Sequence, residues 1–470
     1  FMQKTSRKKG LLRRFWPYPK KYRRVLVFDL FCAALTTICD MVLPLIMRYL
    51  TNTAMTNLAA LTAGAVLRLG GLYLVLRLID GAANYYMADM GHVMGVYVET
   101  DMRRDAFAHL QRLGYTYYSN TKVGQIMGRI TNDLFDVTEF AHHCPEEFFI
   151  AAIKIAVSFV ILCQSSVALT LILFACVPLM AVVSTGINLK VRAAYRRQRV
   201  QIGELNARIE DSLLGERVVK AFANEEVEKE KFERDNAAFQ AIKKQTYRFM
   251  AAFQTSTRLF DGLMYLVVIV AGGLFLVSGR IGAGDMVAYM LYVTTLIATI
   301  RRIVEFAEQF QRGMTGIERF CEIMDADVEI LDGPGALPLQ VQKGCIRFED
   351  VSFEYPDDHN QVLRHVDLEV HPGEKLALVG PSGGGKTTLC NLIPRFYDVT
   401  GGRILIDGQD VRSVTLKSLR GAIGVVQQDV YLFSGSVYEN IAYGKPGASR
   451  QEVEAAARLA GAHEFIAALK

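Results

Sequence analysis

Long apolar stretches alternate with long charged stretches over roughly the first two thirds of the chain, and this pattern predicts a helical membrane domain. About 20 apolar residues in a helix suffice to cross the hydrocarbon core of a bilayer. Six spans are predicted, at residues 25–47, 63–87, 148–163, 167–186, 260–278 and 282–300. The third is short in strictly apolar residues, so we expect its helix to begin further back, near residue 137.

The connections between these spans are very unequal. Residues 164–166 and 279–281 are tight turns, whereas residues 86–140 and 188–253 are long, charged and helical in period. Thirty helical residues extend about 45 Å. The two long connections are therefore expected to project well beyond the membrane.

The pattern changes after the sixth span. Residues 301–324 continue as an amphipathic helix, and glycine and proline then punctuate a linker. Apolar and polar side chains alternate at residues 351–355 and 366–370, which is typical of half-buried strands, and residues 403–406 and 423–426 predict further short strands. The predicted domains are an N-terminal segment (1–24), a six-helix transmembrane domain (25–324), a linker (325–342) and an α/β domain (343–470).

The distribution of charge predicts on which side of the membrane the N-terminus lies. Residues 1–24 contain ten lysines and arginines and no acidic residue, which places this end in the cytoplasm by the positive-inside rule. Phe15, Trp16 and Tyr18 lie among these basic residues, a mixture typical of the membrane interface. No small-residue cleavage site follows, so a signal peptide is not expected. We expect a multi-pass protein of the cell membrane with its N-terminus and its α/β domain in the cytoplasm.

Two features of the composition limit the partners. The net charge of +5 is too small to indicate a nucleic-acid partner. The eight cysteines are scattered without a C-x-x-C spacing, so neither a disulfide framework nor a cysteine metal site is implied.

The segment GPSGGGKTT, at residues 380–388, has the residue types and spacing of a phosphate-binding loop. Gly380 and Gly385 bracket the loop, Lys386 is expected to reach the β- and γ-phosphates of ATP, and the Thr387 hydroxyl to ligate Mg²⁺. The context fits, because residues 375–379 predict a buried strand before the loop and residues 387–397 the start of a helix after it. The alternative is a glycine-rich turn that binds nothing. The predicted cofactor-binding residues here are Gly380, Ser382, Gly383, Gly384, Gly385, Lys386, Thr387 and Thr388.

Two further motifs accompany this loop: FEYP at residues 353–356 and IGVVQQDVYLFSGSVYENI at residues 423–441. With these three motifs, the chain resembles half-transporters of the ATP-binding cassette (ABC) exporter type. The resemblance implies an α/β P-loop nucleotide-binding domain in which Tyr355 stacks on adenine. It also implies that Gln428 reaches the magnesium and the attacking water, so that Lys386 and Gln428 are the catalytic residues and Thr387 and Gln428 the metal ligands. Residues 116–133 and 211–232 resemble the two intracellular loops, with coupling helices near residues 114–121 and 215–222 that dock on a cassette.

One departure from the family concerns catalysis. The signature motif, the Walker B strand with its catalytic glutamate, and the switch histidine do not occur by Lys470, so the cassette in this sequence is C-terminally incomplete. We expect either that the protein continues beyond Lys470 or that it does not hydrolyse ATP unaided.

The resemblance implies ATP-driven export of a small or amphipathic substrate, such as a drug, lipid or peptide, by a dimer of identical or different half-transporters. Two alternatives stay open: an importer built on the exporter fold, and a non-hydrolysing, nucleotide-responsive membrane protein. Charged residues within spans are candidates for function, although Arg77 and Asp80 are spaced to form a structural ion pair. Methionines and tyrosines at or just beyond the end of the second span and within the sixth either line a substrate cavity or pack in the core. The charged candidates are Asp40, Arg77, Asp80, Lys154 and Asp261, and the apolar ones are Met87, Met90, Tyr289, Met290 and Tyr292.

Overall fold

The computed structural model describes residues 10–355, 361–381, 383–427 and 430–469. These residues form two compact units, which we describe separately. Of the described residues, 10–113 and 117–327 belong to the first unit, and 114–116 and those from 328 to 469 to the second.

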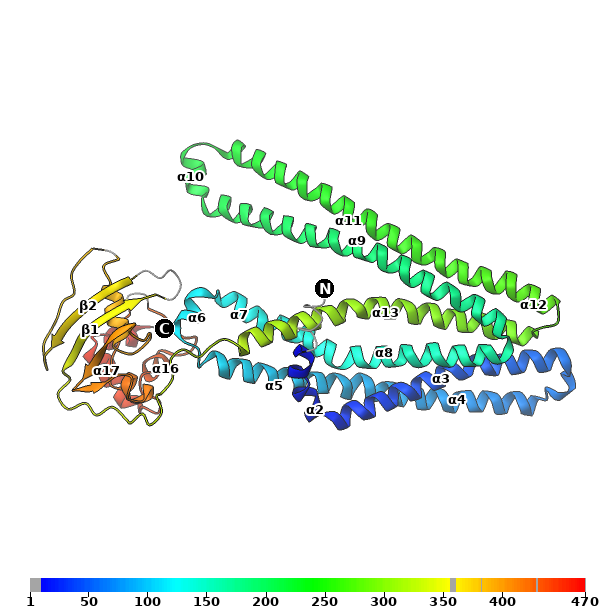
Figure 1. Ribbon diagram of the computed structural model, residues 1–470, viewed down its shortest axis with the longest axis horizontal. Coiled ribbons are helices and arrows are strands. Elements are labelled where there is room, and N and C mark those ends of the chain that lie inside the picture. Colours follow the sequence, from blue (N-terminus) through cyan, green and yellow to red (C-terminus); the bar gives the residue numbers. More distant parts are fainter. Residues whose placement is uncertain (1–9, 356–360, 382, 428–429, 470) are drawn as a thin grey trace. The chain divides into compact units, whose positions relative to one another are not determined.

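The first unit is built of helices (Figure 1). Several are far longer than a bilayer requires; α9 has 48 residues and α11 has 43. Short 3₁₀ and π segments interrupt the series at Leu58–Ala60, Met87–Gly91 and Val268–Gly272. The helices are α2 (Pro17–Lys21), α3 (Arg23–Thr56), α4 (Ala63–Tyr86), α5 (His92–Leu110), α6 (Tyr115–Asn120), α7 (Val123–Ile130), α8 (Asn132–Ser165), α9 (Val167–Leu214), α10 (Glu216–Ala221), α11 (Glu225–Val267), α12 (Gly273–Val277) and α13 (Ala283–Met324).

Within the described residues, five helical stretches are long and apolar enough to cross a membrane. They are Arg23–Thr56, Val123–Ser165, Val167–Leu214, Glu225–Val277 and Ala283–Met324. α4 forms a helix where the second span was predicted but is not among the five, because its most apolar part contains three charged residues, Arg68, Arg77 and Asp80. The third predicted span does begin further back, since α8 starts at Asn132.

The two long charged connections are helical, as predicted. α9 and α11 pack against each other as an antiparallel pair that α10 joins at one end (Figure 1). The short helix α10 coincides with the second predicted coupling helix, and α6 with the first.

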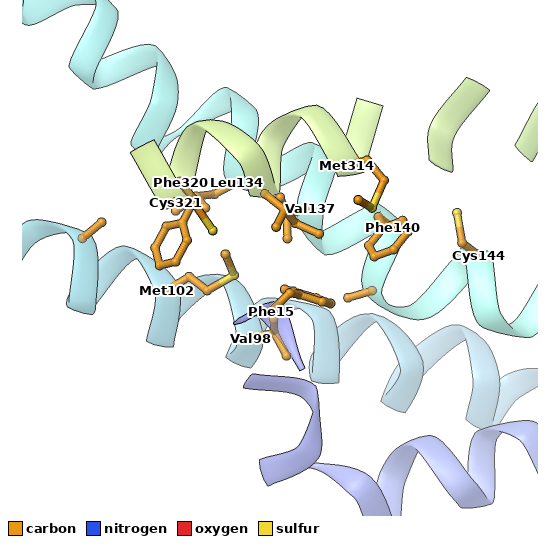
Figure 2. Packing of buried hydrophobic residues seen from close by; sticks show 13 residues of the cluster. Phe15, Val98, Met102, Leu134, Val137, Phe140, Cys144, Met314, Phe320 and Cys321 are labelled. Atoms are coloured by element: carbon orange, nitrogen blue, oxygen red, sulfur yellow. The ribbon is translucent and has the colours of Figure 1, made fainter. Parts of the chain in front are cut away.

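The core of this unit lies where α13 packs along α8. Figure 2 shows Val98 and Met102 of α5 facing side chains of α8 and α13. Glycines on α13 permit this helix to approach α8 closely. A Cβ on Gly313 would lie 2.2 Å from Cβ of Phe140, and one on Gly316 would lie 2.5 Å from a backbone oxygen of α8.

A second core cluster contains Tyr289 and Tyr292, which are fully buried. The Tyr292 hydroxyl donates to the carbonyl oxygen of Met41 at 2.8 Å, and the Tyr289 hydroxyl lies 3.0 Å from the carbonyl oxygen of Leu162. Of the two alternatives for these tyrosines, cavity lining and core packing, the structure therefore supports core packing.

The second unit holds a four-stranded antiparallel sheet in the order β2-β1-β3-β4. Its strands are β1 (Ile346–Glu354), β2 (Gln361–Val370), β3 (Gly401–Ile406) and β4 (Gln409–Asp410). Phe348, Val351 and Phe353 of β1 point into a core that also contains Ile404 and Leu419, with a register irregularity between Phe348 and Val351. The helices are α14 (Lys386–Leu392), α15 (Leu416–Gly421), α16 (Val437–Ala442), α17 (Arg450–Leu459) and α18 (His463–Ala468).

Two strand predictions were wrong. Residues 375–379 and 423–426 form no strand, and most of their apolar side chains are exposed, Val379 to 89% and Val426 to 98%. A strand in a sheet interior needs hydrogen-bonded neighbours, and no described strand pairs with either segment. The three strands predicted at residues 351–355, 366–370 and 403–406 do form, as parts of β1, β2 and β3.

The carboxylate of Asp407, in the turn between β3 and β4, fixes the beginning of the sheet domain. It accepts backbone N–H bonds from Gln342, Lys343, Gly344 and Cys345, at 2.7–3.0 Å. These bonds hold the pKa of Asp407 far below its usual value, because they favour the ionised carboxylate.

Candidate nucleotide-binding site and membrane cavity

The backbone of the phosphate loop takes conformations that favour glycine. Gly383 and Gly385 both have φ of +81°, in the left-handed region. A Cβ on Gly385 would also lie 2.9 Å from Cδ2 of Leu363 on β2, and one on Gly384 would lie 3.1 Å from the Pro381 oxygen. Gly385 is thus favoured by both backbone conformation and space, Gly383 by conformation alone and Gly384 by space alone.

Lys386 is the first residue of α14, and its side chain folds back over the loop. Its Nζ donates to the carbonyl oxygens of Gly380 at 2.9 Å and Pro381 at 2.7 Å. The ammonium therefore already lies on the loop, held by neutral acceptors that an anion could replace. Thr387 is exposed, whereas Thr388 is buried.

Tyr355 follows β1 and lies beside α14. Its hydroxyl is 2.9 Å from Oγ1 of Thr388. Its ring packs edge to face against Phe353 and Tyr397, with centroids 4.9 and 5.5 Å apart. The fold thus brings Tyr355 to the phosphate loop, while its stacking on adenine stays a prediction.

Two predicted site residues, Ser382 and Gln428, lie outside the described residues. The segment after Gln428 is held by Asn440 of α16, whose side chain accepts from the Phe433 N–H at 2.8 Å and donates to its carbonyl oxygen at 2.9 Å. Ser436 and Glu439 form a capping box at the start of α16.

The start of α6 contacts the sheet domain within the second unit. Tyr115 stacks on Phe396 and meets Tyr397 edge to face, with centroids 6.2 and 6.0 Å apart. Thr116 donates to Glu329 at 2.8 Å. Because Tyr397 also touches Tyr355, these aromatic rings join α6 to the side chains beside the phosphate loop.

The membrane unit contains a cavity of about 790 Å³ with charged walls. Four of the five charged span residues singled out from the sequence line it, and they form one network. Arg77 donates to Asp80 at 3.0 Å and to Asp40 at 3.1 Å, and Lys154 donates to Asp40 at 3.1 Å. The expected Arg77–Asp80 ion pair is therefore present, and Asp40 extends it to α3 and α8.

Sequence reasoning missed three further charged residues of this cavity. Glu146, Glu147 and Arg302 also line it, and Arg302 donates to Glu147 at 2.8 Å. Arg302 follows the sixth predicted span, and Glu146 and Glu147 precede the strictly apolar part of the third, so their charge was not counted among the charged span residues. Asp261, which was predicted as a candidate, instead pairs with Arg301 and is not part of this lining.

Comparison with known proteins assigns the class. The family described as ABC transporter transmembrane region matches residues 26–300, and the family described as ABC transporter matches residues 363–469. The chain therefore belongs to the ABC transporter family. Within it, the chain is a half-transporter of the exporter type, with one membrane domain followed by one nucleotide-binding domain.

Three known proteins illustrate this assignment. An uncharacterized ABC transporter ATP-binding protein of Bacillus subtilis, YwjA, is 38% identical over 458 residues, which are 97% of this chain and 79% of the relative. An ATP-dependent lipid A-core flippase of Syntrophus aciditrophicus is 31% identical over 393 residues, which are 84% of this chain and 65% of the flippase. The structure of a bacterial Atm1-family ABC exporter with ATP bound aligns with a TM-score of 0.78 at 26% identity, over 95% of this chain and 79% of that one.

Proposed function

We propose that this protein is an ATP-driven exporter that acts as a dimer of half-transporters. The observation that carries the proposal is one chain that combines a phosphate loop, with Lys386 folded over it, and a membrane unit with a charged cavity. The similarity to exporters supports the outward direction of transport. The basic N-terminal segment supports a cytoplasmic nucleotide-binding domain.

Nucleotide binding rests on the loop and on α14. The backbone N–H groups of residues 382–386 and the Lys386 ammonium hold the triphosphate, since phosphoryl transfer depends mainly on positioning and charge neutralisation. The exposed Thr387 hydroxyl fits the role of a Mg²⁺ ligand, and the metal would neutralise phosphate charge. Tyr355 stacks on adenine, and Gln428 positions the attacking water.

The cavity supports a substrate that carries polar or charged groups. Ionised side chains inside a membrane domain are costly, so those kept there are candidates for contact with a substrate. Carboxylates and cations occur together on its wall, which suits a small zwitterionic or amphipathic molecule better than a purely apolar one. Lipid- and peptide-like substrates both meet this description.

Coupling to the second half-transporter rests on α10. Leu213, Leu214, Val218 and Phe222 around this helix are exposed, each above 60%. Such apolar side chains at the end of a charged helical pair favour a protein contact. We assign that contact to the cassette of the second half-transporter, so that closure of two cassettes on ATP switches the cavity from inward- to outward-facing.

A Lys386→Ala variant tests the nucleotide site. We expect it to bind a fluorescent ATP analogue at least tenfold more weakly than the parent protein and to lose ATP turnover, because no other described side chain donates to the loop in the same way. Lys417→Ala, at an exposed lysine of α15 in the same domain, is the matched control and should leave both unchanged. Unchanged turnover in Lys386→Ala would refute the proposal.

Direction is tested in inverted membrane vesicles that contain the protein. ATP-dependent accumulation of a substrate inside the vesicles supports export, whereas ATP-dependent loss of a preloaded substrate supports import. ATP binding without turnover in the parent protein would favour the non-hydrolysing alternative.

A further inference from the structure

Three histidines from two helices meet in the membrane unit. His92 begins α5, and His142 and His143 are adjacent on α8. The ring centroids of His92 lie 4.6 Å from those of His142 and 4.9 Å from those of His143. One ring nitrogen from each residue can be chosen so that all three lie within 4.8 Å of one another.

His142 is held in the form of a metal ligand. Its Nδ1 lies 2.8 Å from the carbonyl oxygen of Thr138, so Nδ1 carries the proton and Nε2 a lone pair. A histidine that ligates a metal usually donates its other ring N–H to such an oxygen. Within the described chain, Nε2 of His142 has no hydrogen-bond partner although the side chain is only 1% exposed. An unpartnered buried nitrogen of this kind is costly unless it receives a ligand.

A neighbouring carboxylate is also without a partner. Asp29 of α3 is fully buried, and neither of its oxygens has a hydrogen-bond partner among the residues described. Its Oδ1 lies 3.0 Å from the position of a Cβ on Gly91, the residue before His92. Asp29 also interacts electrostatically with His92. A cation at the three histidines would compensate this buried negative charge.

The backbone around the three histidines allows α5 and α8 to approach each other closely. A π segment, Met87–Gly91, directly precedes His92, and π segments occur frequently at functional sites. A Cβ on Gly95 would lie 3.0 Å from Nδ1 of His142 and 2.7 Å from Cγ2 of Thr138. Glycine at this position therefore allows α5 to bring His92 against α8.

We propose that His92, His142 and His143 bind a divalent transition-metal cation, with Zn²⁺ as the reference ion. Neutral imidazole is a ligand for Zn²⁺, Cu²⁺ and Ni²⁺ rather than for Mg²⁺ or Ca²⁺. In a tetrahedral site with Zn–N bonds of about 2.0–2.1 Å, ligand nitrogens are about 3.3 Å apart. The nitrogens lie within 4.8 Å of one another without a metal, and the exposed His92 ring has room to turn toward the other two on binding.

The bound cation links α5 to α8. These helices precede and follow α6 and α7, so the metal ties together the two ends of the first intracellular loop. The inference is independent of the proposed export activity, because none of the three histidines belongs to the phosphate loop or to the cavity lining.

The test uses the full chain, purified in detergent with an affinity tag that contains no histidine. Co²⁺ is the first probe, because tetrahedral coordination by nitrogen gives it a visible absorption. We expect one Co²⁺ per chain, displaced by Zn²⁺. His92→Gln should weaken binding at least tenfold, and since this side chain is exposed the variant should fold normally. His371→Gln, at an exposed histidine of the second unit, is the control and should bind as the parent protein does.

A second measurement separates a metal site from a simple cluster of rings. Zn²⁺ should raise the melting temperature of the parent protein and of Lys386→Ala, but not that of His92→Gln, because a ligand stabilises only the state that binds it. Equal Co²⁺ content in the parent and His92→Gln proteins, or a loss of binding in His371→Gln, would overturn the proposal. Loss of export with intact metal binding would count against the proposed function alone.

Discussion

Replacing Gly313 by alanine should destabilise the membrane unit, although alanine is the better helix former. Gly313 lies on α13 where this helix crosses α8, and a Cβ there would lie 2.2 Å from Cβ and 2.6 Å from Cγ of Phe140. Two carbon atoms in contact are normally about 3.5–4.0 Å apart. Because Cβ of Phe140 is attached directly to its backbone, a ring rotation cannot remove the overlap, and the two helices must separate.

The magnitude follows from two opposing effects. Overpacking a core costs about 1–3 kcal/mol, and the severity of this overlap favours the upper end. Alanine in place of glycine inside a helix returns about 0.5–1 kcal/mol. The net loss is about 2 kcal/mol, which corresponds to a melting temperature lower by about 4–8 °C. Phe140 has little freedom to adapt, since it also packs against Phe15 and Phe310. Figure 2 shows Phe15 and Phe140 in this cluster.

Gly203→Ala is the matched control. Gly203 also lies inside a long helix, α9, but nothing lies within 4 Å of the position of its Cβ. Alanine there should raise the melting temperature by about 1–3 °C, through helix propensity alone. Both variants are measured by differential scanning fluorimetry at one scan rate in the same detergent. A Gly313→Ala protein that melts at or above the parent temperature would contradict the packing of α13 on α8.

Two further changes test the charge networks. Asp407→Asn should lower the melting temperature of the nucleotide-binding domain at pH 7, and the difference from the parent should shrink below about pH 4. The folded pKa of Asp407 is depressed, so its stabilisation is present above the unfolded pKa of about 3.9 and is lost as the pH falls toward the folded value; a difference that persists at low pH would refute this role. Asp40→Asn should cost about 1 kcal/mol, a modest figure because this network is partly exposed, and it should alter substrate-stimulated ATP turnover. Adding Lys154→Met should restore part of the lost stability by removing the unpaired cation, whereas additive losses in the double variant would contradict the network.

The sequence predicted the parts of the fold that depend on local pattern. Apolar length predicted the positions of the helices, and helical period in the charged connections predicted the long helices α9 and α11. The glycines and the lysine of residues 380–386 predicted the loop geometry, because their spacing is set by backbone conformation within one short segment. Tyr355 lies beside the loop through its hydroxyl contact with Thr388, which the sequence did not predict. Its stacking on adenine, which the resemblance implied, stays a prediction.

Features that depend on contacts between distant segments were not predictable. His92 and His142 are separated by 50 positions along the chain and carry no spacing signal, so only the packing of α5 on α8 reveals their cluster. The strand prediction at residues 423–426 was wrong for a related reason: an apolar run becomes a strand only when a neighbouring strand accepts its hydrogen bonds. In α4, Arg77 and Asp80 reduce the apolar character of the helix and also line the cavity, where Arg77 bonds both Asp80 and Asp40.

The antiparallel pair of α9 and α11 has a mechanical consequence. With 48 residues, α9 is on the order of 70 Å long at 1.5 Å per residue. A stiff rod of this length acts as a lever arm: a tilt of about 5° at one end moves the other by about 6 Å, more than one helical turn. A small rearrangement at the end of the pair opposite α10 is thereby amplified at α10. A displacement imposed on α10 is reduced by the same ratio at that opposite end, with a corresponding gain in force.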